Sequence, residues 1–176
     1  MNTLFALSKR SFSTSGANPH VFLSISKAGQ SIGNVVFELY ADQQPQTSQN
    51  FVNLCTAESG RALTGSQFHH GIPGFGISGG KFGDEDLSTF DVRLPDENLD
   101  IRHSRRGLLT TLTHGQNAVG SQFTITFDET PYLDGYQSVF GHVVEGHEVL
   151  DTLEQGCDRH GNIKEEFSIS AAGLKH

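Results

Sequence analysis

Most of the chain alternates apolar and polar residues, which is the pattern of β-strands with one buried face. The runs 21–26 and 35–40 both alternate and flank the turn sequence Ala28-Gly29-Gln30, so they predict an antiparallel hairpin. The clearest alternation lies in 122–127. Further short strands are predicted within 67–82, 107–113, 139–144 and 163–170. The pattern therefore predicts about eight short strands, a number typical of small barrels.

Two segments follow a helical period instead. The segment 45–59 begins with a proline, which favours the first turn of a helix, and its apolar positions share one helical face. The segment 147–155 repeats this spacing. Residues 83–100 are polar and acidic without a period and predict a long loop, which is either an interface or, as is usual for a charge run, solvated. Together these elements predict a mainly β domain over 18–176, a closed eight-stranded antiparallel barrel capped by two α-helices.

The first 17 residues differ from the rest in composition. They contain Lys9 and Arg10 among several serines and threonines, and the first acidic residue of the chain is Glu38. A basic, hydroxyl-rich leader without acids resembles a mitochondrial transit peptide, and the run 10–13 resembles a matrix-protease cleavage site. The alternative is a disordered tail. We expect a mitochondrial protein that faces the matrix, because the apolar stretch is too short for a secretory signal.

Composition excludes several classes of protein. The chain of 176 residues suits one domain, and its formal net charge of −8 disfavours nucleic-acid binding. No apolar run approaches the ~20 residues of a transmembrane helix, so none is expected. The two cysteines, Cys55 and Cys157, are too few for a disulfide scaffold. Cys55 lies on the buried face of the predicted helix, whereas Cys157 is expected to be exposed but without an activating group.

Two sequence patterns resemble cofactor or metal sites, but both lack the secondary structure that such sites require. The string Gly74-x-Gly76-x-x-Gly79 matches a dinucleotide fingerprint, but no helical period follows it. His69 and His70 are adjacent, so on a strand they point to opposite faces and cannot chelate one ion. The sequence therefore predicts neither a cofactor nor a metal.

Several ordered motifs carry a family resemblance. From about residue 18 to the C-terminus the chain resembles a cyclophilin, a peptidyl-prolyl cis-trans isomerase. The strings that carry it are Pro45-x-Thr47-x-x-Asn50-Phe51, Phe68-His69-His70-Gly71-Ile72-Pro73-Gly74-Phe75 with Gly79-Gly80, Asp96-Glu97-Asn98, Gly120-Ser121-Gln122-Phe123-Thr124-Ile125, Tyr132-Leu133-Asp134-Gly135 and Val139-Phe140-Gly141.

The resemblance implies a mechanism without covalent chemistry and without a cofactor. The family holds a proline ring in an apolar pocket and directs an arginine at the prolyl nitrogen, which favours the twisted amide. That arginine directly follows Phe-His, and here the position is His70. Imidazole is shorter and offers fewer donors than a guanidinium. The resemblance thus assigns the catalytic positions to His70 and Gln122.

The peptide-binding groove implied by the resemblance has also changed. Phe75, Gln122 and Leu133 agree with the family. The departures are Gly76 for a methionine, Thr124 for a phenylalanine, Ser78 for a glutamine, Leu112-Thr113-His114 for an Ala-Asn-Ala run, Tyr132 for a tryptophan and Gln137 for a histidine. The substitutions at Gly76 and Thr124 remove apolar surface from the proline pocket. The 112–114 run adds larger side chains where the family's backbone pairs with the peptide.

The residues that the resemblance links to the fold agree with the family, whereas most residues of the catalytic site and groove are replaced. This difference favours a binding or structural subunit of a larger mitochondrial assembly, with weak or lost isomerase activity. The alternative is an active matrix isomerase that assists protein folding. The expected partner is a proline-containing or extended polypeptide, or a neighbouring subunit.

Overall fold

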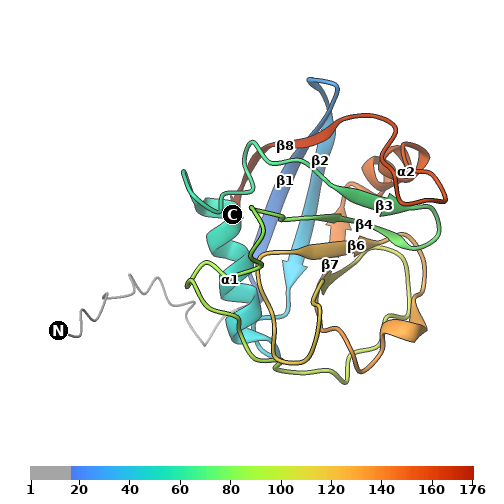
Figure 1. Cartoon of the computed structure of the whole chain (residues 1–176). Helices are drawn as coiled ribbons and strands as arrows, with labels where there is room; N and C mark the ends of the chain where they lie inside the picture. The colour runs from blue at the N-terminus through green and yellow to red at the C-terminus, as the bar shows by residue number, and fades with distance from the viewer. Residues whose placement is uncertain (1–16) are drawn as a thin grey trace.

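Eight antiparallel strands and two helices build the part of the chain that the computed structural model describes, residues 17–176 (Figure 1). Residues 1–16, and with them nearly all of the predicted leader, lie outside the described residues. The strands are β1 (His20–Lys27), β2 (Gln30–Leu39), β3 (His70–Ile72), β4 (Gly76–Gly79), β5 (Leu108–Thr111), β6 (Phe123–Thr126), β7 (Val139–Glu145) and β8 (Phe167–Lys175).

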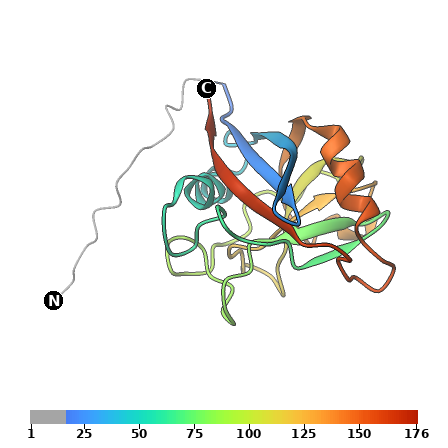
Figure 2. The ribbon, with the colours of Figure 1, turned by 90° about the horizontal axis from the view of Figure 1, so that it is seen from above.

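The strands form one sheet in the order β3-β4-β6-β5-β7-β2-β1-β8. The predicted hairpin is confirmed, with Val21 opposite Phe37 and Leu23 opposite Val35. The C-terminal β8 pairs with β1, so the end of the chain lies beside its first strand (Figure 2). The acidic segment 83–100 contains no strand or helix, as its pattern predicted.

The prediction of a fully closed barrel is wrong. The edge strands β3 and β8 form no ladder with each other, so the sheet is a half-barrel. Only the segment before β3 reaches β8, through one bridge between Gln67 and Ser168 and flanking backbone hydrogen bonds of 2.7–3.0 Å. β3 has three residues and ends at a Pro-Gly turn, which leaves too little extended chain to continue the ladder.

Helix α1 (Pro45–Thr56) begins at a proline that lacks the N–H which would otherwise go unpaired. Its next two N–H groups, of Gln46 and Thr47, donate to the Glu97 carboxylate at 3.0 and 2.7 Å, so a distant loop supplies the cap. The helix ends three residues earlier than predicted, because Ala57 is already extended.

Helix α2 (His147–Gln155) follows Gly146, whose φ of 96° suits glycine. The last strand was predicted to begin at residue 163, which is too early. Ile163 forms an isolated bridge with Cys157 inside a loop, and β8 starts at Phe167 and runs on to Lys175. Figure 2 shows the two helices on opposite sides of the sheet.

Phenylalanines connect α1 to the sheet. Phe51 of α1 meets Phe37, Phe123 and Phe140 edge-on, with ring centroids 5.1–6.4 Å apart. Edge-to-face contacts of this kind add to the burial of the rings themselves. No helix within 17–176 has the length and hydropathy to cross a membrane.

Candidate functional site

Strand register places the expected site residues on the outer face of the sheet. His70 lies opposite Ser78, Ser78 opposite Thr124, and Thr124 opposite Thr110, in one row across β3, β4, β6 and β5. The next row contains core residues such as Ile77 and lies on the inner face. Since side chains alternate along a strand, Gln122 shares the face of Thr124. The structure thus brings the two expected catalytic positions to the same face.

The floor of this face is closed and polar. The hydroxyls of Ser78 and Thr124 share a hydrogen bond of 2.8 Å, and each residue is only 1% exposed. A Cβ on Gly76 would lie 2.8 Å from Cγ2 of Thr124 and 2.6 Å from the Ile125 carbonyl oxygen. Position 76 therefore has no room for a side chain, because both the β6 backbone and the Thr124 methyl group lie too close.

An aromatic pair forms one wall. The rings of Phe75 and Tyr132 stack with centroids 6.1 Å apart and planes 16° from parallel. Tyr132 is 62% exposed, and partial burial and the charge of Asp128 raise the pKa of its phenol. Tyr132 and Leu133 belong to a short 3-10 helix, Pro131–Leu133.

A buried histidine fixes the segment that carries this wall. Nδ1 of His103 lies 2.9 Å from Oδ1 of Asp134, and its Nε2 lies 2.9 Å from Oγ1 of Thr110 on β5. The backbone N–H of His103 donates to the same carboxylate oxygen at 2.7 Å. Burial lowers the pKa of His103 against the opposing pull of Asp134, while the His103 N–H lowers the pKa of Asp134. A neutral imidazole therefore connects the sheet to the groove segment.

A second anchor holds the turn before Phe75. Oε2 of Glu154 accepts from the N–H of Gly74 at 2.8 Å, and its Oε1 accepts from Nη1 of Arg106 at 3.0 Å. Arg106 also donates to the carbonyl of Phe127 and lies 5.6 Å from the centre of that ring. The N–H of Phe127 in turn donates to the carbonyl of Phe75 at 3.0 Å. Helix α2 thereby fixes the β3–β4 turn.

The backbone at Gln122 is held by a residue that the sequence did not indicate. Its N–H and that of Ser121 donate to Oδ1 of Asp86 at 3.3 and 2.9 Å. The Gln122 side chain lies near His69, whose pKa is lowered mainly by burial and further by Lys81, while Gln122 opposes this shift. Asp86 lies in the acidic segment for which we expected solvation, and it is instead part of the site.

His70 is exposed, and its ring packs against a neighbouring loop. A Cβ on Gly161 would overlap Cε1 of this ring and lie 2.7 Å from Nδ1. The N–H of Gly71 donates to the Gly161 carbonyl at 3.2 Å, which fixes the loop beside β3. The imidazole therefore packs against the loop at Gly161, with Cε1 nearest to it.

Two arginines of the described residues, Arg105 and Arg106, are engaged at other places. Arg106 pairs with Glu154 and Asp151 beside α2, and Arg105 lies near Tyr40 and His142. Neither is placed to substitute for a guanidinium at position 70.

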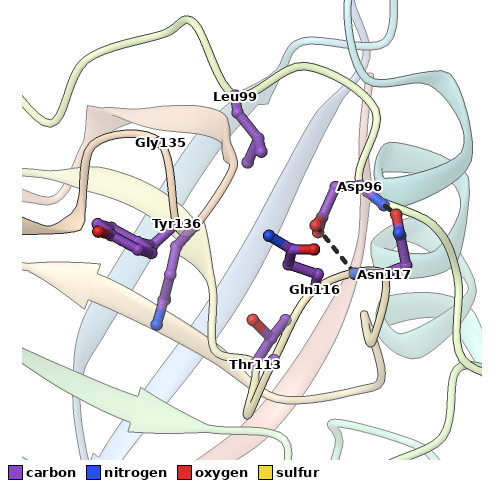
Figure 3. Close-up of a pocket in the computed structure, with 9 residues that line it drawn as sticks. Asp96, Leu99, Thr113, Gln116, Asn117, Gly135 and Tyr136 are labelled. Carbon is purple, nitrogen blue, oxygen red and sulfur yellow. Dashed lines mark hydrogen bonds between the residues drawn. The ribbon is translucent and has the colours of Figure 1, made fainter.

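The remaining expected groove residues lie at the other end of the groove. Leu112 is connected to β6 by its N–H, which donates to the Gln122 carbonyl at 3.2 Å. Thr113 and Gln137 line a cavity of about 590 Å³ (Figure 3). His114, the next residue in the chain after Thr113, is exposed. The expected residues therefore divide between the closed floor at Thr124 and this open cavity.

Neither cysteine is an activated thiol. Cys157 is 4% exposed, which corrects the expectation of an exposed thiol, and burial raises its pKa to about 11. Burial also raises the pKa of Cys55, as expected for its buried helix face. Within the described residues, no three His, Cys, Asp or Glu side chains converge as metal ligands would.

A comparison with protein families identifies the family to which this sheet belongs. The family model described as cyclophilin type peptidyl-prolyl cis-trans isomerase/CLD matches residues 22–174, from β1 to the end of β8. This match covers most of the chain. The chain therefore belongs to the family of cyclophilin-type peptidyl-prolyl cis-trans isomerases.

Proposed function

We propose that this protein binds an extended or proline-containing polypeptide as a subunit of a larger mitochondrial assembly, and that its isomerase activity is weak or lost. The observation that carries the proposal is His70, which stands at the position of the family's arginine and packs against the loop at Gly161.

Rotation about an amide C–N bond costs about 18–20 kcal/mol, because the bond has partial double-bond character. A donor aimed at the prolyl nitrogen lowers this barrier by favouring the pyramidal nitrogen of the twisted state. An imidazole lacks the reach of a guanidinium and offers fewer donors. Loss of one positioned donor typically costs about 2.7–4 kcal/mol of transition-state stabilisation, or a factor of ~10²–10³ in rate.

The closed floor supports the same conclusion. Catalysis requires the proline ring to be held while the chain rotates, and the apolar walls expected at positions 76 and 124 are a glycine and a threonine. The Thr124 hydroxyl is already hydrogen-bonded to Ser78 and shielded from solvent. A proline ring would therefore meet a shallow surface instead of an apolar pocket.

The retained features support polypeptide binding. The Phe75–Tyr132 pair offers a flat aromatic surface, and Leu133 and Gln122 remain at family positions. The His103 and Glu154 anchors hold both sides of the groove in place. A preorganised groove of this kind binds an extended segment with little loss of its own conformational entropy.

The alternative function is that of an active matrix isomerase that assists protein folding. The two anchors and the retained Phe75, Gln122 and Leu133 favour it, because they preserve most of the geometry around the missing donor. It requires that His70, or a substrate group, supply the hydrogen bond.

Activity separates the two functions. We would measure proline isomer exchange on the full chain and on His70→Arg, with an ordinary cyclophilin as reference and His160→Arg as the control for added positive charge. His160 is exposed on the loop that contacts His70. A rate within about tenfold of the reference would refute the impaired function. A background rate that His70→Arg does not raise would refute the active isomerase.

The mitochondrial part of the proposal depends on the basic leader, which lies outside the described residues. Import of the full chain into isolated mitochondria, compared with a chain that starts at residue 18, tests it. Co-migration of the native protein with a large complex after mild detergent extraction tests the assembly. Import without the leader, or migration as a free protein of about 19 kDa, would contradict the respective part.

A further inference from the structure

We propose that Asp86 is a positioning residue of the peptide-binding groove and that it acts through Gln122. Asp86 belongs to the acidic segment 83–100 and lies outside all the motifs that carry the family resemblance. The inference rests on the proposed function, because Gln122 is one of the three groove residues that agree with the family. It gives the acidic segment a role in peptide binding that its composition alone did not assign.

Asp86 differs from the acidic residues directly before it. Asp84 and Glu85 are exposed, whereas Asp86 is half-buried. Its Oδ1 accepts hydrogen bonds from the backbone N–H groups of Ser121 and Gln122 at 2.9 and 3.3 Å. Hydrogen bonds from backbone N–H groups to a carboxylate are strong, because the acceptor is charged. One oxygen of Asp86 therefore holds two consecutive residues at the point where the chain enters β6.

Two glycines make the approach of Asp86 to this segment possible. A Cβ on Gly120 would overlap the Asp86 carboxylate and lie 2.7 Å from the backbone carbon of Asp86. A Cβ on Gly80 would overlap the Ser121 carbonyl oxygen, and the Ser121 hydroxyl donates to the Gly80 carbonyl at 2.6 Å. The absence of side chains at positions 80 and 120 therefore leaves the space that Asp86 and Ser121 occupy.

Helix α1 holds the same segment by a carbonyl group. Nδ2 of Asn50 donates to the Gly120 carbonyl at 2.9 Å, and Oδ1 of Asn50 accepts from the N–H and the hydroxyl of Thr89 at 2.8 and 2.9 Å. Thr89 follows Asp86 by three residues, so Asn50 connects the acidic segment and the segment before β6 to one helix. The acidic segment is thus fixed where Asp86 contacts the N–H groups of residues 121 and 122.

The direction of the Gln122 side chain depends on this backbone. Gln122 is half-buried and shares the outer face of the sheet with Thr124. A long side chain loses rotational freedom when it binds a ligand, and the loss is smaller when its direction is already fixed. Asp86 therefore raises the peptide affinity of the groove by holding the backbone from which the Gln122 side chain projects.

A double-mutant cycle tests whether Asp86 acts through Gln122. We would measure by calorimetry the dissociation constants of the blocked peptides Ala-Ala-Pro-Phe and Ala-Ala-Ala-Phe for the full chain, Asp86→Ala, Gln122→Ala and the double variant. Asp86→Ala should weaken binding by about two- to tenfold, the usual effect of ordering one long side chain. In the Gln122→Ala background the same change should have no further effect, because residues that act through one another are not additive.

Two further variants separate positioning from stability. Asp84→Ala, a change at an exposed acid of the same segment, should leave the affinity unchanged. Asp86→Asn keeps the Oδ1 acceptor without the charge and should retain most of the affinity that Asp86→Ala loses. Urea midpoints verify that each variant is folded. Unchanged affinity of Asp86→Ala, or a loss that is equally large without Gln122, would overturn the positioning role.

Hydrogen exchange separates this inference from the proposed function. The amides of Ser121 and Gln122 should exchange slowly in the natural protein and about tenfold or more faster in Asp86→Ala, since they lose bonds to a charged group. Asp86→Asn should give a smaller increase, and Asp84→Ala none. If neither peptide binds the natural protein, polypeptide binding is refuted, while faster exchange confined to these two amides still supports the hold of Asp86 on Gln122. Unchanged exchange in Asp86→Ala would refute that hold, whatever the peptides do.

Discussion

Replacement of His103 by leucine tests the anchor between the sheet and the groove. The imidazole is completely buried and hydrogen-bonds to the Asp134 carboxylate and the Thr110 hydroxyl, both at 2.9 Å. Leucine fills a similar volume but removes both bonds. The single hydroxyl proton of Thr110, which the neutral imidazole accepts at Nε2, can turn to the Ser138 carbonyl 3.1 Å away, and Asp134 keeps the backbone N–H of residue 103.

The cost follows from the two lost bonds. A hydrogen bond to a charged group contributes about 1.5–3 kcal/mol and a neutral one about 0.5–1.5 kcal/mol. We therefore expect His103→Leu to lower the free energy of unfolding by about 2–4 kcal/mol. In urea unfolding this shifts the midpoint by roughly 1 M or more. His160→Leu, the same change at an exposed histidine, should stay within about 0.5 kcal/mol of the natural protein.

The pH dependence adds a second readout. Because burial lowers the pKa of His103, the folded protein keeps the ring neutral, while the unfolded chain takes up a proton below about pH 6.5. The stability contributed by His103 is therefore complete above about pH 6.5 and decreases as the pH falls toward the folded pKa. His69 and His142, whose pKa values are also lowered, are present in both proteins and cancel in the difference.

The difference in unfolding free energy between the natural protein and His103→Leu should thus be larger at pH 7.5 than at pH 5.5. An unchanged urea midpoint for the variant would refute the anchor. A difference that grows as the pH falls would mean that His103 is charged in the folded state, contrary to the effect of its burial.

Further predictions concern the backbone and the second anchor. Gly80→Ala should destabilise the protein far more than Gly83→Ala. Both glycines have φ near 70–80°, but only at position 80 would a Cβ overlap a backbone carbonyl. Equal urea midpoints for the two variants would contradict this. Glu154→Gln should lower the unfolding free energy by about 1–2 kcal/mol, since it weakens the bonds to Gly74 and Arg106, and should weaken peptide binding in calorimetry. Unchanged peptide affinity would show that the turn needs no such anchor.

Local patterns in the sequence accounted for most of the elements. Alternation over 21–26 and 35–40 predicted the β1–β2 hairpin, and helical spacing with Pro45 predicted α1 to within three residues at its end. These predictions succeed because a buried face imposes its period on neighbouring residues. The predicted start of β8 was wrong. Ile163 fits the same apolar pattern, but it lies in a loop, where it forms an isolated bridge with Cys157.

The expected site residues were identified by motif position, and their side-chain partners were not. Nothing in the sequence connects His103 to Asp134, 31 residues away, or Gly74 to Glu154, 80 residues away. Asp86 has the composition of a solvated loop, yet it binds the backbone of Gln122. The cavity at Thr113 and Gln137 could not be predicted either, because its walls come from separate loops.

The sequence by itself determined the antiparallel β fold, the two helices and the replacement of the family's arginine by His70. Only the tertiary structure decided that the sheet stays open between β3 and β8, that Thr124 closes the groove floor and that Asp86 holds the backbone of Gln122. The physical reason is one of range. Backbone periodicity and residue type act over a few neighbours, whereas the burial and pairing of each polar atom depend on segments that meet only when the whole chain is packed.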